Sequence, residues 1–352
     1  MSPREPAAAI DLLGGPPARA HPPGAPRGGR GTPDKACGGT LRGEDVQSIA
    51  LPPLRKRDAA ADPSARSARA PAARRRLVEE QIAGGTEGLV VGGTTGEGQL
   101  MSWDEHIMLI AHTVHRFGDK IAVIGNTGSN ATREAVHATC QGFAVGMHAA
   151  LHINPYYGKT SEDGLYRHFE EALSYGPSIV YNVAARTAQD ITPDIMENLA
   201  EHPNFAGIKE CAGTERIKHY TDQGIVCWTG NDDEAHQDRY EGGATGVISV
   251  TSNVAPKLMH QLMHDGPDAD LRDRLLPLMN WLFAEPNPIG LNTLSAMTGM
   301  AKPVFRLPYV PYNRELREQG KAILEELGED SFVHDGPVRV LEDSDFIIVS
   351  KY

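Results

Sequence analysis

Short apolar runs alternate with longer amphipathic stretches from about Leu77 onward. Each run is nearly continuous in apolar character, as expected of strands that are buried on both faces of a parallel sheet. The runs cover residues 88–93, 121–125, 150–154, 178–183, 205–209, 225–228 and 246–250. Helical patterns lie between them, at 104–116, 132–143, 161–174 and 192–201. This alternation predicts an α/β fold with a parallel sheet.

The number of strands suggests a barrel with a weak beginning. A (β/α)₈ TIM barrel needs eight strands and about 250 residues. A helical pattern at 75–83 precedes the first clear strand, so the eighth strand has to lie upstream, where the weak run 46–51 is the sole candidate. We expect a barrel over 77–255 whose first strand is degenerate or missing. A C-terminal helical cap over 256–352 follows, with helices at 257–263, 270–282 and 313–327.

The first 76 residues have a different composition. They hold 14 Lys and Arg against 7 Asp and Glu, are rich in Pro, Gly and Ala, and contain no aromatic residue. Such a leader cannot bury enough apolar area to offset the entropy of ordering it, so we predict disorder. Its Arg- and Ala-rich character favours an organelle transit peptide. A low-complexity extension, or translated non-coding or frame-shifted sequence, is the alternative, and the protein would then be cytoplasmic.

Composition excludes several classes of partner. The net charge of −12 argues against a general nucleic-acid binder. No apolar run approaches the 18–20 residues or so that span a bilayer, so we expect no membrane partner. The cysteines form no CxxC pair, and the helical pair His112 and His115 has no accompanying carboxylate triad. The sequence therefore predicts neither a disulfide framework nor a metal site.

Lys209 is the outstanding candidate for chemistry. It ends the run 205–209, and strand alternation places Phe205, Gly207 and Lys209 on one face. If that face points into the barrel, desolvation lowers the pKa of the amine and makes it nucleophilic toward carbonyls. We expect Gly207 to leave room for the lysine side chain. The alternative is a lysine that extends from the strand end into solvent.

Other polar residues follow other predicted strands. Tyr181 could pass a proton to a carbinolamine, and Arg186 in the next loop could clamp a carboxylate. The glycine-rich loop 92–98 lacks the pattern of a phosphate or dinucleotide loop, but its backbone N–H groups could hold a carboxylate. Tyr156 and Tyr157 follow a further strand. Taken singly, each could instead be a core, solvated, turn or interface residue.

Together these motifs resemble the dihydrodipicolinate synthase family, in particular its plant-type form. The matching stretches, in family order, are GGTTGEGQLMSWDEH, GNTGSNATREA, HINPYYGK, YNVAARTAQDI, GIKEC, GNDDE, GVISV, EPNPIGLN and PVFRLPYVP. The resemblance implies a class I aldolase on a TIM barrel. Lys209 would form a Schiff base with pyruvate, and the enamine would attack L-aspartate 4-semialdehyde. The product would be 4-hydroxy-tetrahydrodipicolinate, on the route to lysine, with no metal or organic cofactor.

The resemblance also implies a role for each candidate residue. The proton relay maps onto Thr94, Tyr157 and Tyr181, with Tyr157 supplied across a tight dimer. Thr95 would contact the pyruvate carboxylate, and Arg186 would receive the carboxylate of the semialdehyde. Gly230 and Ile248 would form the pocket wall. Because these partners all fall at other strand ends, they favour a buried Lys209 over a solvated one.

Regulation and assembly are implied as well. The family is inhibited by L-lysine at a dimer interface, and the matching residues are Trp103, His106, Asn130, Glu134 and Tyr156. Glu134 could pair with the amine of the inhibitor, and Asn130 could bond its carboxylate. The chain would form a homodimer, or a homotetramer of two dimers, and the leader would direct it to the plastid (chloroplast) stroma.

The chain departs from the family pattern at two places that matter. No clear opening strand precedes Leu77, and Ala184, Ala185 and Ala188 replace the usual Pro, Ser and Gly around Arg186. Loss of the rigid proline and the permissive glycine could shift the loop that carries Arg186. Two alternatives therefore stay open. The chain could be another pyruvate-dependent class I aldolase, such as an N-acetylneuraminate lyase, or a non-catalytic barrel that lacks its first strand.

Overall fold

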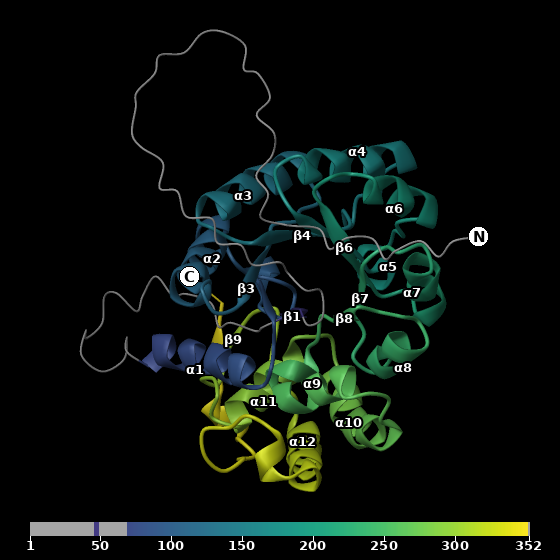
Figure 1. Cartoon of the computed structure of the whole chain (residues 1–352). Helices are drawn as coiled ribbons and strands as arrows, with labels where there is room; N and C mark the ends of the chain where they lie inside the picture. Colours follow the sequence, from purple (N-terminus) through teal and green to yellow (C-terminus); the bar gives the residue numbers. More distant parts are fainter. Residues whose placement is uncertain (1–45, 49–68, 351–352) are drawn as a thin grey trace.

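A computed structural model describes residues 46–48 and 69–350 of the chain (Figure 1). Most of the predicted leader, at 1–45 and 49–68, lies outside the described residues. Helix α1, Arg69–Ala83, begins within the last residues assigned to that leader, so the helix predicted at 75–83 starts earlier than expected. Its first turns contain Arg69, Ala70 and Pro71, which carry no apolar periodicity to mark a start.

The centre of the molecule is a curled parallel sheet with its strands in sequence order from β1 to β8. Helices surround the strands on the outside (Figure 1). All seven predicted strands are present as β2 to β8, which confirms an α/β fold with a parallel sheet. Their bounds are β2 Gly88–Val91, β3 Ala122–Asn126, β4 Ala149–Ile153, β5 Ser178–Asn182, β6 Phe205–Glu210, β7 Cys227–Thr229 and β8 Gly246–Val247.

The weak upstream candidate at 46–51 contributes a short strand. β1, Val46–Ser48, pairs in parallel with β2, with Val46 opposite Gly88. β8 also contacts β1. Residues 49–51 of the candidate lie outside the described residues. The strand is only three residues long, which explains why its sequence signal is so faint.

Two of the outer helices, α2 and α4, begin at a serine that caps the helix. Ser102 caps α2 by accepting a hydrogen bond from the backbone N–H of Glu105, whose side chain in turn accepts from the N–H of Ser102. Ser161 caps α4 in a similar way through the N–H of Gly164. The helices between the strands are α2 Trp103–Phe117, α3 Thr132–Ala144, α4 Glu162–Leu173, α5 Ala184–Thr187, α6 Pro193–Ala200, α7 Thr214–Thr221 and α8 Ala235–Tyr240.

The C-terminal region contains the three predicted helices, and it also contains elements that the sequence did not predict. The predicted helices are α9 Pro256–His264, α10 Ala269–Leu282 and α12 Arg314–Leu327. Helix α11, Ile289–Met297, is apolar on nearly all sides and buried, so it shows no helical periodicity. Strands β9, Val304–Arg306, and β10, Ile347–Val349, pair in parallel but are too short to show alternation.

Both faces of the sheet are buried, as parallel strands require. One apolar cluster lies between the strands and the helices, and contains Phe169, Val180 and Ile208. Another occupies the interior and contains Ile179, Tyr181 and Trp228. Successive residues of β5 therefore alternate between the two clusters, which aims Tyr181 at the interior.

Candidate active site

Lys209 and Tyr181 lie side by side at the C-terminal ends of two neighbouring strands. They are paired positions in the ladder between β6 and β5. The Lys209 amine is 4.4 Å from the centre of the Tyr181 ring. Each residue is only 8% exposed. The lysine side chain therefore enters the protein and does not extend into solvent.

Burial controls the protonation of both groups. Desolvation lowers the pKa of Lys209, and the positive charge of Arg186 acts in the same direction, whereas Cys211 and Asp232 oppose the shift. Burial also raises the pKa of Tyr181 well above its usual value, and Cys211 adds to this. An amine with a lowered pKa next to a protonated phenol forms a nucleophile and a proton donor in one place.

Two glycines shape the surroundings of the lysine, but in different ways. A Cβ on Gly230 would come within 2.7 Å of Lys209 Cε and 2.4 Å of Cys211 Sγ. Any larger residue at position 230 would therefore collide with the lysine side chain. Gly207 does not make room for Lys209, contrary to expectation. Its φ of +144° and a contact of 2.6 Å from an added Cβ to Trp228 Cζ3 show that it accommodates the indole.

The glycine-rich loop after β2 is held by the C-terminal region. Thr94 is half-buried and Thr95 is buried, and the hydroxyl of Thr95 accepts a hydrogen bond of 3.0 Å from Asn287 Nδ2. Glu97 has a left-handed backbone (φ 57°) and accepts a bond of 2.6 Å from Asn292 Nδ2. Asn287 and Asn292 belong to the stretch EPNPIGLN. The sequence analysis did not predict that this stretch holds the glycine-rich loop.

The remaining substrate candidates lie at different depths around the same end of the sheet. Ile248 is buried in the interior cluster together with Tyr181. Arg186 is exposed on the short helix α5, which directly follows β5. Tyr157 is 92% exposed and has a left-handed backbone (φ 69°), so within one chain it does not join the buried pair.

Three of the residues matched to an inhibitor site lie on the adjacent helices α2 and α3, and the other two lie in loops. Trp103 and His106 stack on α2 with ring centres 5.2 Å apart. Burial lowers the pKa of His106 to about 4. Glu134, in the first turn of the neighbouring α3, is partly exposed and pairs with Arg133 at 3.0 Å. Asn130 just before α3 and Tyr156 after β4 are both exposed.

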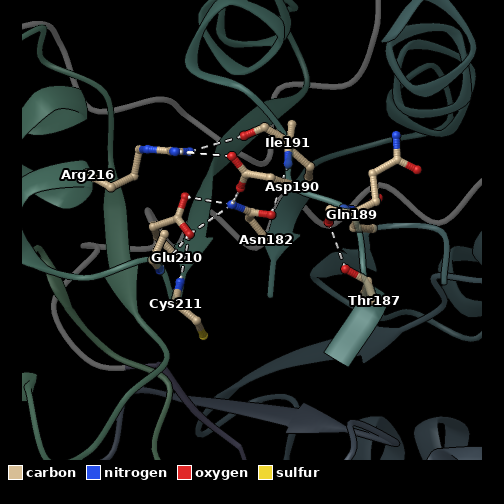
Figure 2. Close-up of polar contacts among 10 residues, drawn as sticks. Asn182, Thr187, Gln189, Asp190, Ile191, Glu210, Cys211 and Arg216 are labelled. Atoms are coloured by element: carbon tan, nitrogen blue, oxygen red, sulfur yellow. Dashed lines mark hydrogen bonds and ion pairs between the residues drawn. The ribbon is translucent and has the colours of Figure 1, made fainter. Parts of the chain in front are cut away.

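A buried polar network, which sequence reasoning missed, joins the residues that follow Lys209 and Tyr181 in the sequence (Figure 2). Glu210 Oε1 accepts hydrogen bonds from the N–H groups of Cys211 at 2.8 Å and Ala212 at 3.0 Å. It also accepts one of 3.0 Å from Asn182 Nδ2. Burial raises the pKa of Glu210 to about 7. Because Asn182 follows Tyr181 and Glu210 follows Lys209, the network fixes the ends of both strands.

Comparison with known proteins identifies the family. The model of the dihydrodipicolinate synthetase family matches residues 69–327. The chain belongs to this family. It is 62% identical over 276 residues to the chloroplastic 4-hydroxy-tetrahydrodipicolinate synthase of Coix lacryma-jobi, covering 78% of this chain and 73% of the relative. It is 60% identical to synthase 1 of Arabidopsis thaliana, also named chloroplastic, covering 78% of this chain and 76% of that one.

Solved structures of the dihydrodipicolinate synthetase family share the fold. The Acinetobacter baumannii dihydrodipicolinate synthase, solved in complex with pyruvate, superposes with a TM-score of 0.73 at 33% identity. The match covers 81% of this chain and 98% of that structure. A lysine-bound enzyme from Cyanidioschyzon merolae, at 23% identity, shares the fold with a TM-score of 0.72.

Two further properties concern the described part of this family member. Among residues 46–48 and 69–350, no group of three or more His, Cys, Asp or Glu side chains is placed to hold a metal ion. Within the same ranges, no helix is both long enough and apolar enough to cross a membrane.

Proposed function

We propose that this protein is a 4-hydroxy-tetrahydrodipicolinate synthase that uses Lys209 as its Schiff-base residue. It is a lyase of lysine biosynthesis that condenses pyruvate with L-aspartate 4-semialdehyde. The observation that carries this assignment is the buried Lys209 amine beside the Tyr181 ring, in a chain of the dihydrodipicolinate synthetase family.

The chemistry follows from an amine with a lowered pKa beside a phenol with a raised pKa. Lys209 Nζ attacks C2 of pyruvate to give a carbinolamine, and Tyr181 gives a proton to the departing hydroxyl, which leaves as water. The resulting iminium accepts the electron pair that is released when the pyruvate methyl group loses a proton. The enamine so formed attacks the aldehyde carbon of the semialdehyde. The amino group of the adduct then displaces Lys209 and closes the ring.

The other candidate residues bind the substrate carboxylates or relay protons. The Thr95 hydroxyl, oriented by Asn287, contacts the pyruvate carboxylate together with the loop N–H groups. Arg186 receives the carboxylate of the semialdehyde, because a guanidinium offers two parallel donors at an accessible position. Thr94 and Tyr157 complete the proton relay with Tyr181. Gly230 and Ile248 form the wall beside the lysine.

The chain works as a homodimer or as a homotetramer of dimers. Tyr157 is too exposed to relay protons within its own chain, so a second copy has to bury it beside the partner's site. The pair Trp103 and His106, with Asn130, Glu134 and Tyr156, forms the binding site for the inhibitor L-lysine. The C. merolae relative was solved with lysine bound, which supports an inhibitor site. A relative at 31% identity is described as a monomeric variant, so a test of assembly has to distinguish a monomer from a dimer or tetramer.

The architecture is completed by three assignments. The sheet over 77–255 is completed by β1 at Val46–Ser48 and closes into a (β/α)₈ barrel, since β1 pairs with β2 and contacts β8. Residues 256–352 form the C-terminal region that holds the glycine-rich loop through Asn287 and Asn292. The leader directs the protein to the plastid stroma, as the chloroplastic names of the plant relatives support.

Borohydride reduction in the presence of pyruvate tests the assignment. We expect a covalent adduct on Lys209 that is lost in Lys209→Ala. The matched control is Lys218→Ala, which removes an exposed lysine of α7 paired with Asp222. Folded wild-type protein without an adduct would contradict the proposal and favour a non-catalytic barrel. An adduct without turnover of the semialdehyde would identify another pyruvate-dependent aldolase.

A further inference from the structure

Two loops that carry candidate residues have strained backbones. The loop between β4 and α4 carries Tyr156 and Tyr157, and both Tyr157 (φ 69°) and Lys159 (φ 29°) are left-handed. The segment after β5 carries Arg186 and ends in Ala188, also left-handed (φ 60°). Non-glycine residues persist in such conformations only where the surrounding contacts hold them there.

Gln189 makes the contacts that join these two loops. Its side-chain Nε2 donates to the carbonyl of Thr160 at 2.7 Å, and its Oε1 accepts from the N–H of Thr160 at 2.9 Å. Its own carbonyl accepts a hydrogen bond from Asn154 Nδ2. Asn154 and Thr160 stand on either side of Tyr156 and Tyr157, so one residue holds both ends of the loop that bears the tyrosines.

The position of Gln189 is itself fixed to the sheet (Figure 2). Thr187 Oγ1 donates to the Gln189 carbonyl at 2.9 Å. The next residue, Asp190, accepts from Asn182 Nδ2 at 2.7 Å and pairs with Arg216 at 3.1 Å. The N–H of Ile191 donates to Asn182 Oδ1 at 3.1 Å. Asn182 directly follows Tyr181. Gln189 therefore fixes the position of both loops relative to the end of β5, which carries the phenol.

We propose that Gln189 is a positioning residue for the second substrate, acting by setting the separation between the Arg186 loop and the Tyr157 loop. This inference rests on the proposed function and concerns its second half-reaction, the addition of the semialdehyde. The ligand is the carboxylate-bearing aldehyde that Arg186 receives. The pyruvate half-reaction depends on Lys209, Tyr181 and the loop after β2, none of which bonds to the Gln189 side chain.

The sharpest test is Gln189→Glu, which preserves shape but replaces a donor by a carboxylate oxygen that faces the Thr160 carbonyl. We expect kcat/KM for the semialdehyde to fall about tenfold or more, chiefly through KM, because a displaced binding group loses alignment. The pyruvate KM, the yield of the borohydride adduct and the melting temperature should stay near wild-type values. Gln189→Met, which has similar length and no amide, should behave in the same direction.

Gln319→Glu is the matched control, because it makes the same change at an exposed position of α12. It should leave both substrates unaffected. Unchanged use of the semialdehyde in Gln189→Glu and Gln189→Met would overturn the proposal. A parallel loss for both substrates with a lower melting temperature would also overturn it, since it would show a merely structural role. Failure of the proposed function itself would appear separately, as wild-type protein that forms no pyruvate adduct.

Discussion

The Lys209 amine lies 4.4 Å from the centre of the Tyr181 ring, at paired positions of two adjacent parallel strands. The face of an aromatic ring attracts a cation, so this contact alone would favour the charged amine. Burial acts the other way, and the pKa of Lys209 is lowered. Desolvation is the largest cause of this shift, and a lowered pKa makes it easier for the amine to lose its proton and attack a carbonyl.

Tyr181→Phe should separate the ring from its hydroxyl. The phenyl ring keeps the packing in the interior cluster, so we expect little change in melting temperature. Adduct formation with pyruvate should slow by roughly 10²- to 10⁴-fold, the usual contribution of a general acid, without disappearing. The rate of adduct formation is measured by quenching the reaction with borohydride at a series of times. An unchanged rate would show that water or another group supplies the proton.

Arg186→Ala should affect the two substrates unequally. Removing the guanidinium should raise the KM for the semialdehyde far more than that for pyruvate. It should also shift the pH profile of adduct formation. Arg186 lowers the pKa of Lys209, so its loss raises that pKa and moves the rising limb of the profile to higher pH. Equal losses for both substrates and an unshifted profile would refute the role given to Arg186.

The sequence predicted all seven strands from β2 to β8, because each is a nearly continuous apolar run, and it favoured a buried Lys209. It also placed Phe205 on the same face as Lys209, which is wrong: Phe205 lies in the cluster between strands and helices, and Ala206 lies in the interior cluster. The ladder between β5 and β6 shifts register at this point, so the alternation of side chains is broken.

The sequence could not predict that Gly207 accommodates Trp228, since that contact joins two strands. The pairing of Glu210 with Asn182 is likewise a contact between strand ends. The clearest available signal was that each polar residue directly follows a candidate residue.

Short or fully buried elements escaped prediction for a different reason. β9 and β10 have three residues each, which is too few for a period of two to be distinguished from chance. Helix α11 is buried on nearly all sides and therefore lacks a polar face. Exposure of Tyr157 also could not be read from its sequence neighbours, because it depends on how the loop after β4 turns.

Ala188→Gly should stabilise the protein. Ala188 is left-handed (φ 60°), which costs an L-residue about 1 kcal/mol, although glycine returns part of this as extra freedom in the unfolded chain. A net gain of about 0.5 kcal/mol is expected, measured as a higher denaturation midpoint. Ala184→Gly, at the right-handed start of α5, is the control and should destabilise.

Glu134→Ala should relieve inhibition by L-lysine while leaving turnover largely intact. Glu134 lies on α3, beside the helix that carries Trp103 and His106, and is partly exposed, so its carboxylate is available to the amine of an inhibitor. Inhibition curves at fixed substrate measure the effect. Glu162→Ala, in the first turn of α4, provides a control acidic position. Equal sensitivity of Glu134→Ala and wild type would remove Glu134 from the inhibitor site.

Acid should destabilise the protein through buried histidines, and His152 and His168 act here in the same direction as His106. Burial lowers the pKa of His152 to about 3 and that of His168 to about 4, from 6.5. Both are neutral when folded, whereas the unfolded chain takes up protons below pH 6.5. Their contribution to stability is therefore complete above pH 6.5 and is lost as the pH falls toward 3–4. At pH 5 each histidine should cost on the order of 2 kcal/mol relative to neutral pH.

His168→Gln tests this dependence. Glutamine can still bond the Thr132 hydroxyl, which lies 2.9 Å from His168 Nδ1, but it cannot titrate. The difference in melting temperature between pH 7.5 and pH 5.0 should become smaller in the variant than in wild type. His137→Gln, at an exposed position of α3, should retain the full wild-type difference. If His168→Gln retains it as well, the acid sensitivity has to come from other groups, and the burial of a neutral His168 would not be its cause.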